Sequence, residues 1–205
     1  MNESRAISNI ITITVFVIAT VVTSLASAPE WAEKRSSNTT ALSEVEIEML
    51  SYMREEEKLA RDVYLLMYET WETEIFSTIA ESEQTHMDSM KKKLDKYNLE
   101  DSADPAPGVF NNEFLQEKYD ELIVSGSSSL IDGLYAGATI EEIDMIDIMH
   151  AIDVTTHLDI VTAYQNLLEG SKSHLRAYVR GLSAQGFDYS PQFISQELFD
   201  AVIGL

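Results

Sequence analysis

Apolar residues recur at alternating three- and four-residue steps across residues 50–71, interrupted only by Glu57, and this spacing constrains the fold more than any other feature. Residues three and four apart share one face of a helix, whereas a strand has a period of two. Comparable stripes occur within residues 74–97, 129–153 and 156–182, and no stretch has the period of a strand. The sequence therefore predicts an all-α chain with four long helices.

The connections between these segments limit how the helices can be arranged. A break of two to three residues near Glu72 and Thr73 makes the first two helices antiparallel neighbours. Residues 99–126 form a much longer crossover, within which residues 113–124 are expected to form a short helix. We therefore expect a four-helix bundle with a long crossover between its second and third helices.

The predicted bundle domain covers residues 42–205. It begins with the sequence of a capping box, in which Ser43 and Glu46 exchange hydrogen bonds at the start of the first helix. After the fourth helix comes a short C-terminal extension. We expect it to pack across the bundle through the aromatic residues Phe187, Tyr189, Phe193 and Phe199.

Residues 1–28 differ in composition from the rest of the chain. Arg5 precedes an uncharged apolar run that ends in the small residues Ala26-Ser27-Ala28. A basic start, an apolar stretch and small residues are the features of a secretory signal peptide, and an uncleaved membrane anchor is the alternative. We therefore expect an exported protein, secreted or membrane-anchored, with residues 29–41 as a polar linker.

The charge and the cysteine content exclude several kinds of partner and site. The formal net charge is −21, which opposes binding to nucleic acid or to anionic lipid. The chain contains no cysteine, which excludes disulfides, iron–sulfur clusters, zinc–thiolate sites and thiol catalysis. A metal site in this chain must therefore use oxygen and imidazole ligands.

Three acidic residues occur on helix faces that are otherwise apolar. Glu57 interrupts the first stripe, and Glu141 and Asp144 lie in the third. An unpaired carboxylate in a bundle core costs several kcal/mol, so each of these residues needs a partner. Arg61, one turn beyond Glu57, is one candidate partner, and bound cations are the other.

The second and fourth helices carry a histidine in matching apolar frames. One frame is Phe76-x-x-Ile79-x-x-x-Glu83-x-x-His86-Met87, and the other is Tyr164-x-x-Leu167-x-x-x-Ser171-x-x-His174-Leu175. Glu83 and His86 alone are weak evidence, because residues three apart share a face on any charged helix. The repeat is more specific, because a bundle with pseudo-two-fold symmetry would place the two histidines face to face across its core.

These patterns resemble the ferritin-like superfamily, and its rubrerythrin branch in particular. The matching motifs are Glu57-x-x-Ala60-Arg61-x-x-Tyr64 and Phe76-x-x-Ile79-Ala80-x-x-Glu83-x-x-His86. Several stretches are also similar to an uncharacterised ferritin-like family, catalogued as domain of unknown function 2202. These are residues 53–64, residues 82–87, Ile140-Glu141-x-x-Asp144, and Gly170-Ser171-x-x-His174-Leu175-Arg176-Ala177. The resemblance covers roughly residues 43–193.

The resemblance implies a di-metal site in the core of a ferritin-like bundle. The implied ligands are Glu57, Glu83, His86, Glu141 and His174. The chain departs from the superfamily at Ser171, where ferritin-like proteins usually carry a glutamate and where a hydroxyl would be a poor ligand. Asp144 would restore a fourth carboxylate, so that four negative charges balance two divalent cations. Glu142 is the alternative ligand from the third helix.

The metal and its chemistry follow from the same resemblance. Carboxylate and imidazole ligands suit two divalent ions, iron above all, with manganese and zinc as alternatives. A di-iron pair implies ferrous iron oxidation or the reduction of oxygen or peroxide, with an external electron donor because the chain lacks a cysteine-ligated iron centre. The alternative is a non-catalytic metal-binding or scaffold protein, and a homodimer is compatible with either function.

Overall fold

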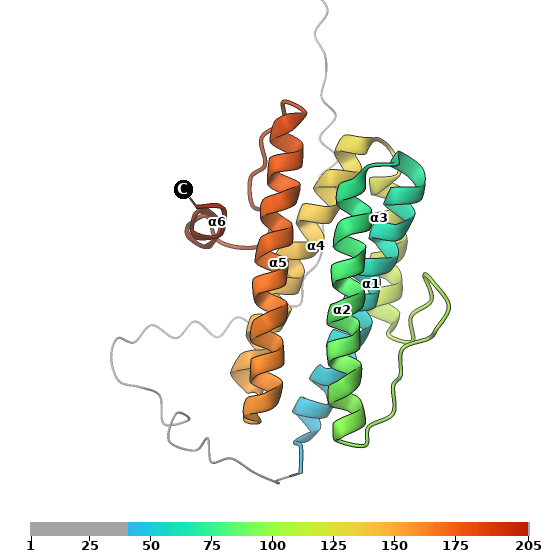
Figure 1. The fold of residues 1–205 in the computed structure, drawn as a ribbon, viewed down its shortest axis with the longest axis vertical. Coiled ribbons are helices and arrows are strands. Elements are labelled where there is room, and N and C mark those ends of the chain that lie inside the picture. The colour runs from blue at the N-terminus through green and yellow to red at the C-terminus, as the bar shows by residue number, and fades with distance from the viewer. Residues whose placement is uncertain (1–40, 205) are drawn as a thin grey trace, which may run out of the picture. The chain divides into compact units, whose positions relative to one another are not determined.

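The structure is a computed structural model that describes residues 41–204. In these residues it contains six α-helices and no strand, which confirms the predicted all-α class (Figure 1). The helices are α1 (Glu44–Trp71), α2 (Glu74–Lys96), α3 (Glu113–Gly126), α4 (Leu130–Val154), α5 (Leu158–Ala184) and α6 (Gln196–Ile203). The predicted signal segment and nearly all of the predicted linker lie outside the described residues.

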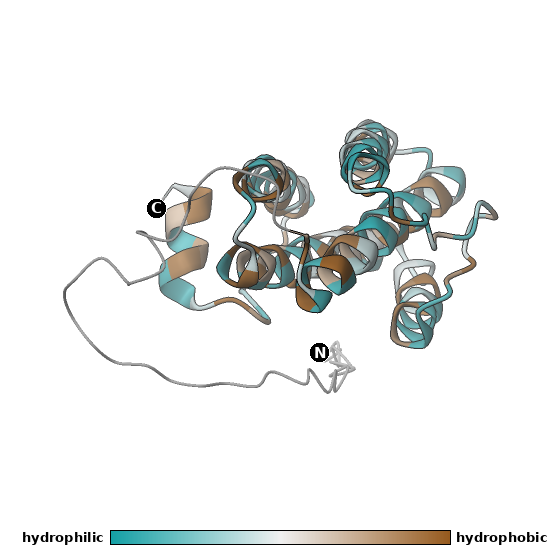
Figure 2. Ribbon diagram, turned by 90° about the horizontal axis from the view of Figure 1, so that it is seen from below, coloured by the Kyte–Doolittle hydropathy of each residue, from teal (hydrophilic) through white to brown (hydrophobic). Residues whose placement is uncertain are grey.

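The four longest helices pack side by side. α1 packs against α2 and α4, and α5 packs against α4 and α2, so that the four helices close into a ring. The shorter α3 lies in the long crossover and packs against α1 and α4. Figure 2 shows the long helices end-on, with α6 lying across their direction. No helix among the described residues is long and apolar enough to span a lipid bilayer.

The C-terminal segment returns to α5 through fewer aromatic residues than the sequence predicted. Tyr189 and Phe199 are buried as expected, whereas Phe187 is 45% exposed, so its predicted packing is wrong. Phe187 lies in the turn that ends α5, where its backbone N–H donates to the carbonyl of Leu182 (3.0 Å). The segment instead adds the aliphatic residues Ile194 and Val202 to the core.

The hydrophobic core consists of two clusters that follow one another along the long helices. On α1, Leu50 and Met53 belong to one cluster and Val63 and Met67 to the other, with Glu57 between them. On each of the other three long helices, buried polar residues also separate the residues of one cluster from those of the other. These are Glu83 between Ile79 and Met90 on α2, Glu141 and Asp144 between Ala138 and Ile148 on α4, and Ser171 and His174 between Leu167 and Tyr178 on α5. The buried polar residues therefore form one layer between two apolar ones.

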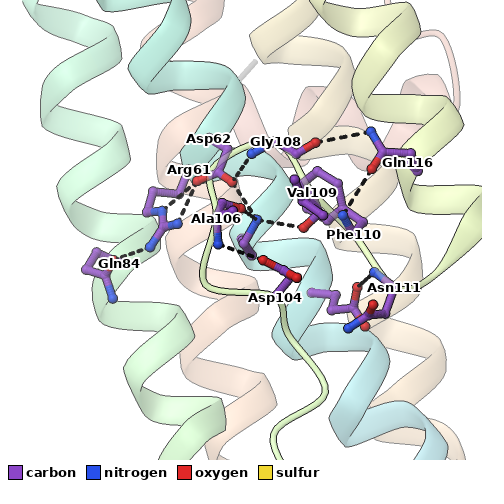
Figure 3. Close-up of polar contacts among 12 residues, drawn as sticks. Arg61, Asp62, Gln84, Asp104, Ala106, Gly108, Val109, Phe110, Asn111 and Gln116 are labelled. Atoms are coloured by element: carbon purple, nitrogen blue, oxygen red, sulfur yellow. Dashed lines mark hydrogen bonds and ion pairs between the residues drawn. The ribbon is translucent and has the colours of Figure 1, made fainter.

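A buried ion pair on α1, Lys58 with Asp62, forms hydrogen bonds to the crossover between α2 and α3. Figure 3 shows Asp62 beside this crossover. Lys58 Nζ donates to Asp62 Oδ2 at 2.7 Å. It also donates to the backbone carbonyls of Ala106 and Val109, at 2.9 and 3.0 Å. Asp62 Oδ2 in turn accepts the backbone N–H of Gly108 at 2.9 Å. The ammonium group of Lys58 thus uses its donors on α1 and on the crossover together.

Glu55 makes a second attachment between α1 and the crossover. Its Oε2 accepts the backbone N–H groups of Asn111 and Asn112, at 2.9 and 3.2 Å. Its Oε1 accepts the hydroxyl of Ser102 at 3.3 Å. Because the crossover covers this side of α1, Glu55 is buried although it lies in a run of charged residues.

Glu46 joins the start of α1 to the start of α5. The predicted capping box is confirmed, with Ser43 N donating to Glu46 Oε2 at 2.9 Å. The other carboxylate oxygen of Glu46, Oε1, accepts the backbone N–H of Thr156 and contacts His157 Nδ1, both at 2.8 Å. Against the effect of burial, hydrogen bonds from His157, Ser43 and Thr156 lower the pKa of Glu46 to about 2.

We expect Glu46→Gln to lower the free energy of unfolding by about 1–3 kcal/mol at pH 7. Because the folded-state pKa is below the ordinary value of 4.5, the carboxylate's contribution is fully present above pH 4.5 and is lost as the pH falls towards 2. The difference between variant and wild type should therefore shrink in acid. Urea unfolding at pH 7 and pH 3 measures it, with the exposed Glu48→Gln as control. An equal difference at both pH values would contradict this assignment.

Candidate metal centre

The polar layer brings together acidic and histidine side chains from all four long helices. α1 supplies Glu57, α2 supplies Glu83 and His86, α4 supplies Glu141, and α5 supplies His174. The three glutamates are each at most 2% exposed. The structure thus places five of the six residues predicted from the sequence within one cluster.

Glu83 lies at the centre of this cluster. Its Oε2 is 2.7 Å from His86 Nδ1, and its Oε1 is 2.8 Å from His174 Nδ1. Glu57 Oε2 lies 3.1 Å from His86 Nδ1 on one side. Glu141 Oε2 lies 3.4 Å from His174 Nδ1 on the other. Each histidine therefore faces one carboxylate of its own and shares Glu83 with the other histidine.

The two histidines face each other across the core, as the repeated sequence frame predicted. Their ring centroids are 5.6 Å apart. The hydroxyl of Ser82 orients the ring of His174, because it lies 2.9 Å from Nε2, the ring nitrogen that does not face the carboxylates. The ring of His86 instead lies against the backbone of α5 at Gly170. In both cases Nδ1 is the nitrogen that faces the carboxylates.

The ligand atoms form two overlapping groups, each of a size that fits one metal ion. One oxygen each of Glu57 and Glu83 and a nitrogen of His86 all lie within 4.8 Å of one another. The same holds for Glu83, Glu141 and His174. The acidic and histidine groups could therefore hold metal ions, and Glu83 would belong to both positions.

Two buried oxygen atoms in this layer have no hydrogen-bond partner. They are Oε1 of Glu57 and Oδ1 of Asp144. A buried oxygen without a partner is costly, by about 1–3 kcal/mol for a neutral group and more for a charged one. Carboxylate oxygens beside imidazole nitrogens are also a donor set that divalent ions accept. The residues present therefore fit a pair of divalent metal ions.

In the absence of metal, the buried charges of the layer shift one another's pKa values. Burial and the facing carboxylate of Asp144 raise the pKa of Glu57 well above its ordinary value. Against the effect of burial, the facing carboxylates raise the pKa of His86 to about 11 and that of His174 to about 10. The same two histidines lower the pKa of Glu83 to about 2, again against burial. Without metal, protonated histidines carry the positive charge that the carboxylates require.

Asp144 lies in the same buried layer but outside the two groups of ligand atoms. Its Oδ2 accepts the hydroxyl hydrogen of Ser171, while its Oδ1 is without a partner. Ser171, which stands on α5 where a glutamate was expected, therefore hydrogen-bonds the carboxylate of Asp144 on α4. Metal binding by Asp144 stays a prediction.

Two alternatives from the sequence take other places in the structure. Arg61 donates to Asp62 and to Gln84, so it is not the partner of Glu57. Glu142 Oε2 accepts three backbone N–H groups of the C-terminal segment, those of Gln192, Phe193 and Ile194. Glu142 therefore anchors this segment to α4 and faces away from the cluster around Glu83.

Sequence reasoning missed the tyrosine that supports Glu141. Tyr64 donates its hydroxyl to Glu141 Oε1 at 2.6 Å, and its ring packs against Tyr178 with centroids 5.4 Å apart. Tyr64 closes the motif Glu57-x-x-Ala60-Arg61-x-x-Tyr64, but its place in an apolar stripe did not indicate a contact with Glu141. Sequence reasoning also missed Glu56, which is buried although it belongs to a charged run on α1.

Gly170→Ala is expected to displace His86 and to weaken metal binding. A Cβ atom at residue 170 would lie 2.4 Å from His86 Cε1 and 2.5 Å from Nε2, so the ring must leave the position in which its Nδ1 faces Glu83. Gly181→Ala on the same helix is the control, because its Cβ would approach Leu134 no closer than 3.4 Å. Binding of manganous ion by both variants measures the effect. Equal binding would contradict a role for His86.

Comparison with known proteins places the chain among relatives of similar length. A family model described as "Uncharacterized protein domain (DUF2202)" matches residues 46–204. The chain is 48% identical over 163 residues to the uncharacterized protein MJ0754 of Methanocaldococcus jannaschii, covering 79% of this chain and 88% of that protein. The crystal structure of the hypothetical protein MJ0754 matches with a TM-score of 0.80 at 47% identity, covering 83% of this chain and 98% of that chain. The family match includes every residue of the candidate metal centre.

Proposed function

The chain belongs to the DUF2202 domain family, and we propose that it is a ferritin-like four-helix bundle protein that binds two divalent metal ions, iron above all. The position of Glu83 carries this proposal. Its two oxygens lie 2.7 and 2.8 Å from nitrogens of histidines on two different helices. Glu57 would complete the position at His86, and Glu141 the position at His174.

The number of buried carboxylates supports a pair of ions over a single one. Glu57, Glu83, Glu141 and Asp144 carry four negative charges when ionised, which two divalent ions balance. We propose Asp144 as the fourth carboxylate ligand. Ser171 holds one of its oxygens and leaves the other without a partner. The hydroxyl would thus position a ligand rather than serve as one.

The surroundings of the site favour oxidation chemistry with small reactants. Ferrous iron held by these carboxylates and imidazoles would supply electrons to oxygen or peroxide, and manganese or zinc would fit the same ligands. Apolar clusters on both sides of the layer exclude bulk water. Tyr64 holds Glu141 in place through its hydroxyl. We propose ferrous iron oxidation as the reaction, or peroxide reduction with an external electron donor.

A non-catalytic metal-binding protein is the second candidate, and Ser171 favours it because the hydroxyl replaces a glutamate ligand. Addition of ferrous iron to metal-free protein distinguishes the two functions. An oxidase binds about two ions per chain and consumes oxygen, whereas a metal-binding protein takes up the iron without consuming oxygen. The exposed Glu81→Gln on α2 should behave as wild type in both measurements. Protein that takes up neither iron nor manganese would contradict the di-metal proposal.

We also propose that the protein acts outside the cytoplasm. The support is the pattern of residues 1–28, with Arg5, an apolar run and the small residues Ala26-Ser27-Ala28. Cell fractionation with sequencing of the mature N-terminus tests this proposal. Full-length protein in the soluble cytoplasmic fraction would contradict it.

A further inference from the structure

A second group of acidic residues lies between α1 and α4, next to the candidate metal centre. The hydroxyl of Tyr52 on α1 contacts two carboxylates. It lies 3.4 Å from Glu56 Oε1 on the same helix and 3.1 Å from Asp147 Oδ2 on α4. A hydroxyl has a single hydrogen, so it can donate to only one of these carboxylates at a time.

Two buried oxygens in and beside this group lack hydrogen-bond partners. Glu56 and Asp144 are each 5% exposed, and neither Glu56 Oε2 nor Asp144 Oδ1 has a hydrogen bond. Within residues 41–204, no lysine, arginine or histidine forms an ion pair with Glu56, Asp144 or Asp147. The basic residues within this range thus leave the group without direct compensation.

The carboxylates crowd one another in the absence of a cation. Glu56 Oε1 and Asp147 Oδ2 come from two different helices and meet at the same hydroxyl, that of Tyr52. A bound cation would relieve this repulsion and would also supply a partner for the oxygens that lack one.

We propose that Glu56 and Asp147, with the hydroxyl of Tyr52, form a third cation site, which binds a hard divalent ion such as calcium or manganese. The reason for this choice is that the group offers only oxygen atoms, from two carboxylates and the hydroxyl of Tyr52. Calcium and magnesium prefer oxygen ligands, and manganese accepts them, whereas the histidine nitrogens of the neighbouring pair favour iron, manganese or zinc. Asp147 is partly exposed, so the site lies where the core meets the surface.

Competition between two metals tests this proposal. Manganese bound to metal-free, full-length protein is counted by electron paramagnetic resonance at about 0.15 M salt, which screens weak surface binding. Wild type is expected to bind about three manganese ions per chain, and excess calcium should displace one while leaving about two at the histidine-containing pair.

Two isosteric variants on different helices locate the displaced ion. Glu56→Gln and Asp147→Asn should each bind two manganese ions, and calcium should displace neither. The exposed residues Glu48 on α1 and Asp153 on α4 provide the controls, and Glu48→Gln and Asp153→Asn should both behave as wild type. Circular dichroism checks that each variant is folded, and if one variant fails to fold, the other decides.

Each result separates this proposal from that for the histidine-containing pair. Two manganese ions in wild type that calcium does not displace would overturn the third site, as would a displaceable ion that persists in Glu56→Gln and Asp147→Asn. A single ion that calcium displaces, and that both variants lose, would support the third site and contradict the pair. Protein that binds no manganese at all would contradict both proposals.

Discussion

Glu83→Gln is expected to remove nearly all of the metal bound at the histidine-containing pair, about two ions per chain, because Glu83 is the carboxylate that both positions of the pair share. Its oxygens contact His86 on one side and His174 on the other. Glutamine keeps the size of the side chain but loses its negative charge and one of its two acceptor oxygens. Metal analysis of purified protein, together with manganese binding, measures the loss.

Variants of the outer carboxylates provide the contrast for this prediction. Glu57 contacts only His86 of the two histidines, and Glu141 contacts only His174. Glu57→Gln and Glu141→Gln should therefore each lose about one ion and retain the other. Glu81→Gln, an exposed change on the same helix as Glu83, should retain both. If Glu83→Gln bound as much metal as Glu57→Gln, the shared position would be wrong.

Lys58→Ala is expected to have the largest effect on stability, lowering the free energy of unfolding by about 3–5 kcal/mol. The ammonium group is 1% exposed and donates to Asp62 and to two carbonyl groups of the crossover. Its removal takes one donor from the buried carboxylate of Asp62, which keeps Arg61 and the backbone N–H of Gly108, and one donor from each of two carbonyl groups of the crossover. Each hydrogen bond of a charged group contributes about 1.5–3 kcal/mol. Urea unfolding at neutral pH measures the change.

A second lysine on the bundle provides a matched control. Lys91 and Asp95 also form an ion pair four residues apart on a helix, but their side chains are 40% and 60% exposed. Lys91→Ala should therefore change the free energy of unfolding by no more than about 0.5 kcal/mol. Equal effects of Lys58→Ala and Lys91→Ala on the free energy of unfolding would show that burial of the Lys58–Asp62 pair does not determine its contribution to stability.

Local periodicity was sufficient to predict the helices and much of the candidate site. The predicted helix at residues 74–97 compares with α2 at Glu74–Lys96, and that at residues 113–124 with α3 at Glu113–Gly126. Glu57 stood out because it interrupts an apolar stripe, and His174 because its apolar frame matches that of His86. Residues on one face of a helix meet the facing residues of its neighbours, so a face read from the sequence predicts which side chains come together.

The remaining polar residues of the core could not be predicted in this way, because contacts distant in sequence bury them. Glu55, Glu56 and Lys58 belong to a charged run that is typical of a solvent-exposed face, yet all three are buried. The crossover covers Glu55 and Lys58, and α4 covers Glu56. Likewise, Glu142 contacts backbone groups 50–52 residues further along the chain. Helical periodicity carries no information about such contacts.

The enclosure of α1 affects how metal binding must proceed. Four consecutive charged residues, 55–58, are buried in directions that differ by about 100° per residue, so that they face the crossover and the core in turn. The hydrogen bonds of Glu55 and Lys58 to the crossover restrain the turn of helix that carries Glu57. This proposed ligand is therefore preorganised, and an arriving ion would not need to order it. Metal removal should accordingly leave the backbone of α1 in place and change chiefly the protonation of the layer.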